Sequence, residues 1–290
     1  MNSPVKSLSS YMELTKPTIM LLVLFTGAVS LIVEGSLLAR PGRFALVLLG
    51  LYLTGGSANA LNQYFERDLD ARMKRTSGRR PLPTGRIGPA KALAFSAAMG
   101  VIGVGVFAVF FNWLTALLSV LTILFYSLFY TLFLKPRTAQ NIVIGGIAGA
   151  MAPVGAWTAA TGSFDIIPWI LFAIVFFWTP PHFWALALFC RDDYVRTGQP
   201  MLPVTSGNAA TLRQILNYTL VLFAVSLSIM IFGGGWFYLV VALALGGLFV
   251  KRVLDAMRLP QENVLRRLFG YSITYLFGIF AALAFDRLFS

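Results

Sequence analysis

The sequence predicts an all-α polytopic membrane protein that crosses the bilayer nine times. Hydrophobic residues make up 58% of the 290 residues and charged residues only 12%, and the mean hydropathy is +0.77. Nine apolar runs are each long enough to cross about 30 Å of hydrocarbon as a helix. Basic residues gather in alternate loops between these runs. These observations exclude an ordinary soluble domain.

The nine predicted helices differ in composition and in their connections. A loop of about 20 residues follows the second helix and another follows the sixth, and long loops in a compact protein tend to be functional. Phe111-Asn112 is the whole linker between the third and fourth helices, and Gly233 to Gly235 separate the seventh and eighth. The fifth helix is rich in small residues, which favour close helix packing. We predict helices at roughly 18–36, 44–66, 90–110, 112–134, 140–161, 167–190, 213–232, 236–255 and 268–286.

The basic residues also predict how the chain is oriented. With the N-terminus inside, only Arg40, Arg43 and Arg287 of the 23 Lys and Arg residues fall outside. This is a strong positive-inside signal, so we expect a cytoplasmic N-terminus, a C-terminus outside and a place in the bacterial cytoplasmic (inner) membrane. The loops account for the net charge of +12, so we expect no nucleic-acid partner. The leader has the wrong layout for a cleaved signal.

One domain is expected over residues 1–290. The second and sixth helices each end in an acidic cluster followed by basic residues, which predicts two weakly similar four-helix units, helices 1–4 and 5–8, with a ninth helix added. The predicted cytoplasmic loops cover about 67–90 and 191–212. A single cysteine, Cys190, excludes an internal disulfide, and a single histidine, His182, excludes a multi-histidine metal centre within the chain.

The first acidic cluster, NQYFERDLD, lies at the end of the second apolar run. Asn62, Glu66 and Asp70 fall at i, i+4 and i+8, so they share one face of a helix. Asp68 falls roughly 200° round the helix and points away from this stripe. Ionisable groups at membrane depth are costly and usually mark a site. Two carboxylates and an amide on one stripe can hold a divalent cation.

The second acidic cluster, CRDDYVRTG, follows the sixth apolar run and contains Asp192 and Asp193. Taken alone, it is equally well explained as a solvated loop. Taken together, the two clusters match what a diphosphate bound through Mg²⁺ requires, because carboxylates hold the metal while basic groups neutralise phosphate oxygens. The candidate diphosphate-binding residues are Lys74, Arg75, Arg79, Arg80, Lys135, Arg137, Arg191 and Arg196.

These segments resemble a known family. NQYFERDLDARMKRT followed by RRPLPTGRI is similar to the first signature, NxxxDxxxD, of the UbiA superfamily of membrane prenyltransferases. WTPPHFWALALFCRDDYVRTGQPMLPV, from Trp178 to Val204, resembles the signature of its heme O synthase branch, and LKPRTAQNIVIGG, from Leu134, adds a third match. With the nine helices and an inside N-terminus, the resemblance extends over essentially the whole chain.

The resemblance implies a reaction between farnesyl diphosphate and heme b that gives heme O and diphosphate, with Mg²⁺ as cofactor. It places Asn62, Glu66 and Asp70 in the first metal-binding motif, with Glu66 where the family usually has Asp. The usual ends of the second motif fall on Cys190 and Tyr194. Asp192 and Asp193 are therefore the candidates for the second metal shell, and which of them ligates is left open. The catalytic set implied is Asn62, Glu66, Asp70, Asp192 and Asp193.

The resemblance also implies the steps of this reaction and the partners of the protein in the membrane. The metal and basic residues stabilise the departing diphosphate, the allylic cation is attacked by a porphyrin vinyl group, and water completes the product. RTSGRRPLPTGR, from Arg75, is expected to form a lid that excludes water. The lipid bilayer is a partner throughout. A downstream heme A synthase or cytochrome oxidase assembly factors are candidate protein partners.

His182 follows Pro180-Pro181 inside the sixth predicted helix. Because the implied acceptor contains iron and His is a common axial ligand, we expect His182 to bind heme, although a buried His is often a hydrogen-bonded core residue. The two prolines predict an interrupted helix lining a pocket. For Tyr126 and Tyr130, core packing is favoured over a role in a prenyl channel.

Two alternatives remain at this point. A prenyltransferase acting on an aromatic quinone precursor would use the same metal chemistry, but the PPHFWALA segment and the DDY ending argue against it. A secondary transporter would also place acids within the membrane. The acids here lie at the ends of helices rather than at the midplane, which disfavours transport.

Overall fold

The computed structural model describes residues 4–289, with side chains from Leu8 onward, so the side chain of Lys6 and the outermost residues of the predicted domain lie outside the described set. All regular elements in this range are helical. They are α1 (Pro4–Leu14), α2 (Pro17–Glu34), α3 (Pro41–Phe65), α4 (Arg67–Asp70), α5 (Lys74–Ser77), α6 (Pro89–Phe110), α7 (Trp113–Leu124) continuing into the π-helix η1 (Phe125–Leu134), α8 (Asn141–Thr161), α9 (Ile166–Phe189), α10 (Arg191–Arg196), α11 (Leu202–Thr205), α12 (Gly207–Leu227) continuing into the 3₁₀-helix η2 (Ser228–Phe232), α13 (Trp236–Arg258) and α14 (Glu262–Phe289).

Nine helices in the described chain are long and apolar enough to cross a membrane, which confirms the predicted fold class. Their N-termini have simple local causes: Pro17, Pro41 and Pro89 occupy the first turns of α2, α3 and α6, where proline's missing N–H costs nothing. The seventh and ninth helices are longer than the predicted ranges 213–232 and 268–286. The ninth begins at Glu262, because its amphipathic first turns pack against the rest of the bundle.

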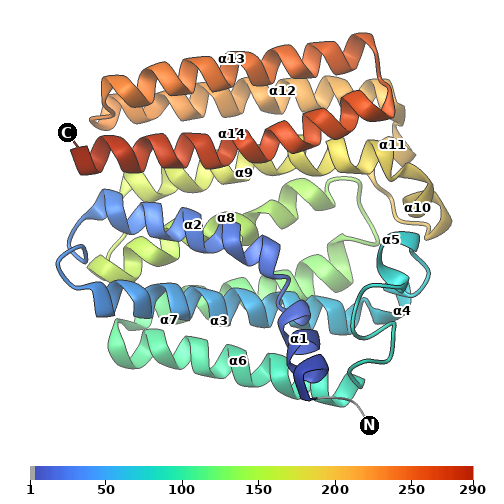
Figure 1. Cartoon of the computed structure of the whole chain (residues 1–290), viewed down its shortest axis with the longest axis horizontal. Coiled ribbons are helices and arrows are strands. Elements are labelled where there is room, and N and C mark those ends of the chain that lie inside the picture. The colour runs from blue at the N-terminus through green and yellow to red at the C-terminus, as the bar shows by residue number, and fades with distance from the viewer. Residues whose placement is uncertain (1–3, 290) are drawn as a thin grey trace.

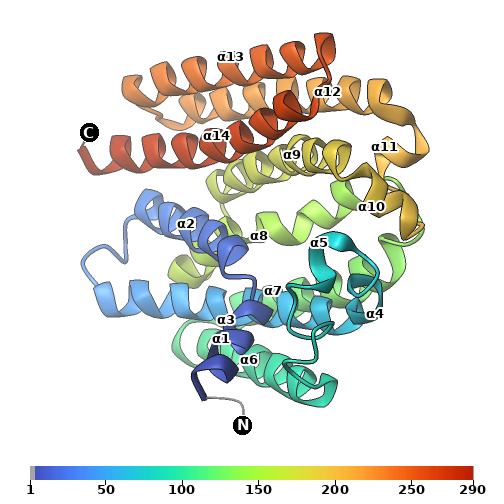
Figure 2. The same ribbon diagram turned by 45° about the vertical axis from the view of Figure 1, so that its right-hand side comes forward.

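The long helices lie side by side with their axes roughly aligned (Figure 1). The α2 helix packs against α3, α8 and α14, while α14 also packs against α9 and α13. The last helix therefore joins the two halves of the chain. Four short helices, α4, α5, α10 and α11, gather at the end of the bundle opposite the C-terminus (Figures 1 and 2). We call this the loop end; it is the end predicted to be cytoplasmic.

Small residues allow the close packing expected of a membrane bundle. A Cβ at Gly145 of α8 would collide with the ring of Tyr130, so this glycine lets η1 approach α8. Large apolar side chains such as Val101, Val109 and Trp113 are exposed on the outside of the bundle. In a membrane helix that outward face contacts lipid rather than water.

Candidate active site

The first acidic cluster continues α3 beyond its formal end. The Glu66 amide donates to the Asn62 carbonyl at 3.0 Å, and the Asp70 amide donates to the Glu66 carbonyl at 2.8 Å. This i, i+4 bonding keeps Asn62, Glu66 and Asp70 on one side of the helix. Their side chains are buried, with exposed fractions of 2%, 6% and 2%, whereas Asp68 is exposed. The helical spacing thus buries Asn62, Glu66 and Asp70 and leaves Asp68 exposed, as the sequence predicts.

Basic side chains from separate segments converge on this stripe. Lys135, just after η1, contacts Glu66 with Nζ 2.5 Å from Oε1. Arg80, from the loop after α5, pairs with Asp70 and lies 4.0 Å from Glu66 Oε2. Lys16 donates from Nζ to Asn62 Oδ1 at 2.7 Å. Unpaired buried charges are strongly unfavourable, so these contacts are what allows the acids to be buried.

Lys16 is the site residue that the sequence does not reveal. It directly precedes Pro17 at the start of an apolar helix, where a lysine is fully explained as an orientation signal. Its φ is 53°, and it is the only non-glycine residue with positive φ in the described chain. This conformation is held by α3, because Asn59 donates to the Thr15 carbonyl at 3.2 Å and Gln63 to the Leu14 carbonyl at 3.1 Å. The turn between α1 and α2 therefore carries Lys16 into the site.

Burial and charge set the protonation of these groups. Burial alone would raise the pKa of Glu66, but the neighbouring Lys135, Lys16 and Arg80 together lower it. The pKa of Asp70 is raised, because burial and the nearby Glu66 outweigh the attraction of Arg80. Burial, with repulsion from Arg80 and Lys135, lowers the pKa of Lys16 to about 7. Three basic side chains around two carboxyls favour the entry of an anion.

The second acidic cluster has a different role in this conformation. Asp193 accepts from the Lys74 and Arg75 amides at 3.4 and 3.3 Å and pairs with Arg196. It therefore joins α10 to the first turn of α5. Asp192 is exposed. Within residues 4–289 no group of three or more His, Cys, Asp or Glu side chains is close enough to hold a metal, so this conformation does not bring the two clusters together as one ligand set.

The predicted diphosphate-binding residues separate into three groups. Arg80 and Lys135 contact the acidic stripe. Arg137 instead donates to the Leu132 and Phe133 carbonyls, and Arg191 to the Pro203 carbonyl. The remaining members have exposed side chains around the loop end: Lys74, Arg75, Arg79 and Arg196.

The donor set of the stripe suits a magnesium ion. Asn62, Glu66 and Asp70 offer an amide oxygen and two carboxylates, which are the hard oxygen ligands that Mg²⁺ prefers. Each of these groups contacts a lysine or arginine of the chain. Binding a metal together with a diphosphate would let those basic groups turn from the carboxylates to phosphate oxygens.

The π-helix η1 also contributes to the site. Asn62 Nδ2 donates to Thr131 Oγ1 at 3.0 Å, and Thr131 in turn donates to the Tyr126 carbonyl five residues earlier, at 2.7 Å. π-helical segments are rare and often occur at functional positions. Tyr130 is buried against α8, as the preference for core packing predicts. Thr131 carries no sequence signal, because its contact depends on the wider π register.

His182 lies in a tightly packed aromatic environment between α9 and α14. Its ring stacks on Trp178 and Phe269, with centroids 4.3 and 4.5 Å away, and Nδ1 lies 2.7 Å from Ser272 Oγ. The Ser272 hydroxyl donates its single proton to the Phe269 carbonyl at 2.6 Å, so it must accept from His182. This pattern assigns the proton of a neutral His182 to Nδ1. Nε2 then carries a lone pair and has no hydrogen-bond partner in the described chain.

The expectation of an interrupted helix at the two prolines is wrong. The α9 helix continues through Pro180 and Pro181 to Phe189. Next to the prolines, the Trp178 side chain of α9 is hydrogen-bonded to the backbone of α14, because its Nε1 donates to the Ser272 carbonyl at 2.6 Å. Packing from the neighbouring helix thus keeps this segment helical.

Known proteins are similar to this chain over most of its length. The model of the UbiA prenyltransferase family matches residues 23–281. The protoheme IX farnesyltransferase of Alkalilimnicola ehrlichii is 48% identical over 283 residues, covering 96% of this chain and 92% of that protein. The protoheme IX farnesyltransferase of Gloeobacter violaceus is 45% identical over 285 residues, covering 98% and 93%.

Solved structures share the fold at low sequence identity. Digeranylgeranylglyceryl phosphate synthase superposes with a TM-score of 0.80 at 18% identity, covering 97% of this chain and 99% of that one. A UbiA homologue from Archaeoglobus fulgidus bound to GPP and Mg²⁺ superposes with a TM-score of 0.63 at 14% identity, covering 94% and 99%. At these identities the likeness concerns the fold.

Proposed function

The chain belongs to the UbiA prenyltransferase family, and from this premise we propose that it transfers the farnesyl group of farnesyl diphosphate to heme b, giving heme O and diphosphate. Relatives that are 45–48% identical over nearly the whole chain carry the name protoheme IX farnesyltransferase, which supports the heme branch over a quinone branch. The observation that carries the proposal is the buried Asn62, Glu66 and Asp70 stripe faced by three basic side chains.

In this proposal the stripe forms the diphosphate site. Asn62, Glu66 and Asp70 would hold Mg²⁺, which when bound neutralises charge on the leaving diphosphate. Lys135, Arg80 and Lys16 donate hydrogen bonds to phosphate oxygens that carry increasing charge as the C–O bond breaks. Asp192 and Asp193 remain predicted ligands of a second metal. A movement of α10 away from α5 would be needed before Asp193 could take that role.

Other residues bind the acceptor and exclude water. The allylic cation is attacked by the terminal carbon of a heme vinyl group, water adds to the resulting cation, and one proton is lost. His182, with Nε2 available, is the proposed contact to the heme iron. The loop from Arg75 to Arg86 covers the site through Arg80 and is held by the Arg86 pair with Glu13. This loop is the proposed barrier to bulk water.

The membrane arrangement completes the proposal. We place the chain in the bacterial cytoplasmic membrane, and the distribution of Lys and Arg supports an orientation with the loop end, and hence the site, on the cytoplasmic side. A farnesylated porphyrin stays in the bilayer, which supports direct transfer to a membrane-bound heme A synthase or a cytochrome oxidase assembly factor.

The test is product analysis with purified full-length protein. Detergent-solubilised protein is incubated with heme b, farnesyl diphosphate and Mg²⁺, with and without chelator, and extracted porphyrins are analysed by mass spectrometry. We expect a chelator-sensitive product heavier than heme b by a farnesyl group plus a hydroxyl group. A parallel incubation replaces heme b by an aromatic acid, and prenylation of that acid alone would place the chain in a quinone branch. The absence of both products would indicate a non-enzymatic role such as transport.

A further inference from the structure

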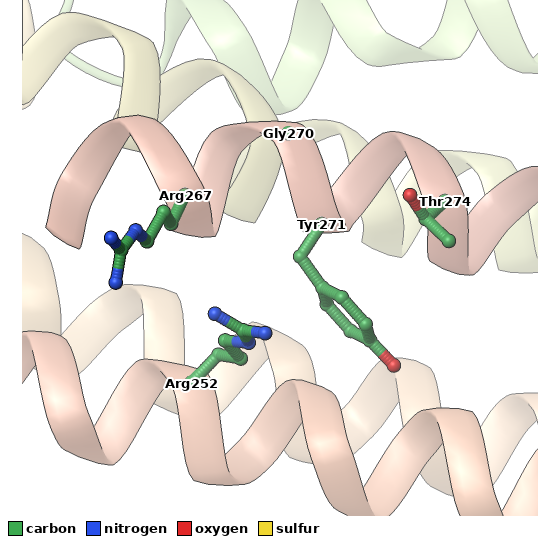
Figure 3. A pocket seen from close by; sticks show the side chains of 5 residues that line it. All are labelled: Arg252, Arg267, Gly270, Tyr271 and Thr274. Carbon is green, nitrogen blue, oxygen red and sulfur yellow. The ribbon is translucent and has the colours of Figure 1, made fainter. Parts of the chain in front are cut away.

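A shallow groove lies between α13 and α14, away from the acidic stripe. It has a volume of about 390 Å³ and is lined by Arg252, Arg267, Gly270, Tyr271 and Thr274. Figure 3 shows the guanidinium groups of Arg252 and Arg267 reaching from the two helices into the same space. Two like charges facing one groove repel each other unless an anion lies between them.

Both arginines lack a carboxylate partner among the described residues. Within residues 4–289, Arg252 and Arg267 form no ion pair, whereas Arg80, Arg86, Arg196 and Arg266 each have a carboxylate partner. Of the nearest acids in sequence, Glu262 pairs with Arg266, and Asp255 forms no ion pair with either groove arginine in the described part of the chain. The positive charge of the groove is therefore available to a ligand.

The groove is also partly preorganised. Arg252 lies over the Tyr271 ring at 5.6 Å, and the Tyr271 hydroxyl donates to the Leu245 carbonyl at 2.8 Å, which fixes the ring. Thr274 adds a hydroxyl group. A Cβ at Gly270 would meet no atom within 4 Å, so the absence of a side chain there keeps the groove open.

Its depth in the membrane favours a lipid headgroup. Exposed Trp236 begins α13, and Arg252 lies sixteen residues further, or about 24 Å along the helix axis. That length approaches the thickness of the hydrocarbon layer, so the groove lies close to the interface on the loop-end side. Basic pockets between membrane helices at this level are suited to lipid phosphates.

We propose that the α13–α14 groove binds a phosphate group through Arg252 and Arg267, with the headgroup of an anionic lipid as its source. The bidentate geometry of guanidinium groups suits phosphate oxygens. The positive-inside rule explains the presence of arginines at this end of the bundle but not their convergence on one groove. The proposal is independent of the proposed enzymatic reaction.

The test uses native mass spectrometry of the detergent-purified full chain titrated with phosphatidylglycerol, and in a separate arm with inorganic phosphate. We expect one tightly bound phosphatidylglycerol, with Arg252→Gln and Arg267→Gln each weakening it about tenfold. Binding of phosphatidylglycerol alone assigns the site to lipid. Binding of inorganic phosphate with the same dependence on both arginines keeps the phosphate site and identifies a soluble source.

Matched variants distinguish a site from diffuse attraction. Arg258→Gln removes an equal charge from the end of the same helix outside the groove and is expected to leave binding unchanged. Gly270→Leu fills the groove without changing charge and is expected to weaken binding as much as loss of an arginine, whereas Gly247→Leu, at another open helical glycine, is not. Equal weakening by Arg258→Gln, or full binding by Gly270→Leu, would overturn the proposal.

Discussion

At the scale of single residues, the site depends on two buried acids and one buried amide, each of which accepts from a basic side chain. Glu66 has Lys135, Asp70 has Arg80, and Asn62 has Lys16. Breaking a buried pair by removing one partner is far more costly than losing an exposed one, because the remaining charge is left without compensation. The same residues must therefore serve both the fold and the chemistry, and variants have to be chosen to separate the two.

Glu66→Gln keeps the shape of the side chain but removes the charge that would hold a metal. We expect prenyl transfer to fall by about 100-fold or more, because transition-state charge loses its stabilisation. Thermal stability should also fall, since Lys135 loses its partner. Asp68→Asn is the control, because Asp68 is exposed in the same segment. If Asp68→Asn lost as much activity as Glu66→Gln in a product assay, the stripe would not be the site.

We predict that binding of a diphosphate is linked to protonation of Lys16. Its pKa of about 7 in the free protein would rise when a diphosphate places negative charge beside it. Between these two pKa values the complex holds more protons than the free protein, so binding takes up protons and weakens as the pH rises. Calorimetry of pyrophosphate binding at pH 8 in buffers of different ionisation enthalpy measures this uptake. Lys16→Met should lower the uptake; an unchanged value would remove Lys16 from the site.

We predict that replacing Ser272 changes the heme spectrum through His182. Ser272→Ala removes the acceptor that fixes the Nδ1–H form of His182. Losing such a partner behind a metal ligand typically costs 10–100-fold in affinity, so we expect heme b binding to weaken by about that factor and its Soret band to shift. The KM for farnesyl diphosphate should not change. Thr274→Val on the same helix is the control, and a Soret titration identical to wild type for Ser272→Ala would argue against ligation by His182.

At the scale of elements, the nine long helices were predictable because length and apolar composition alone decide them. The short helices α4, α5, α10 and α11 were not, since four to six residues form a stable helix only when other segments hold them. The first turn of α5, for example, is capped by Asp193 from a distant segment. Lys16 and Thr131 were not predicted for the same reason, because their contacts depend on other segments. The α1–α2 turn brings Lys16 to Asn62, and the π-helical register of η1 brings Thr131 to it.

Asp193 allows capping and metal ligation to be separated. Asparagine keeps one of the two acceptor oxygens that Asp193 offers to the amides of α5, whereas alanine keeps neither, so capping predicts that Asp193→Asn loses clearly less activity than Asp193→Ala, which loses about fivefold to tenfold. We expect this pattern in steady-state assays of product formation. Exposed Asp192, replaced by Asn, is the comparison. Equal and severe losses for both Asp193 variants would instead assign the residue to the metal.

At the scale of the whole molecule, the positive surroundings of the stripe link ligand binding to the stability of the bundle. The basic residues come from the α1–α2 turn, the loop after α5 and the end of η1, so an anion bound among them ties three separate segments to α3. A ligand at 100 times its Kd stabilises the folded state by about 2.7 kcal/mol. We therefore expect pyrophosphate to raise the melting temperature of the detergent-solubilised protein, and Mg²⁺ to raise it further.

In a Glu66→Gln, Asp70→Asn double variant, the increment in melting temperature from Mg²⁺ should disappear, while the increment from pyrophosphate alone should persist because the basic side chains remain. Loss of both increments would mean that the carboxylates organise the anion site itself, and retention of both would place the metal elsewhere in the protein.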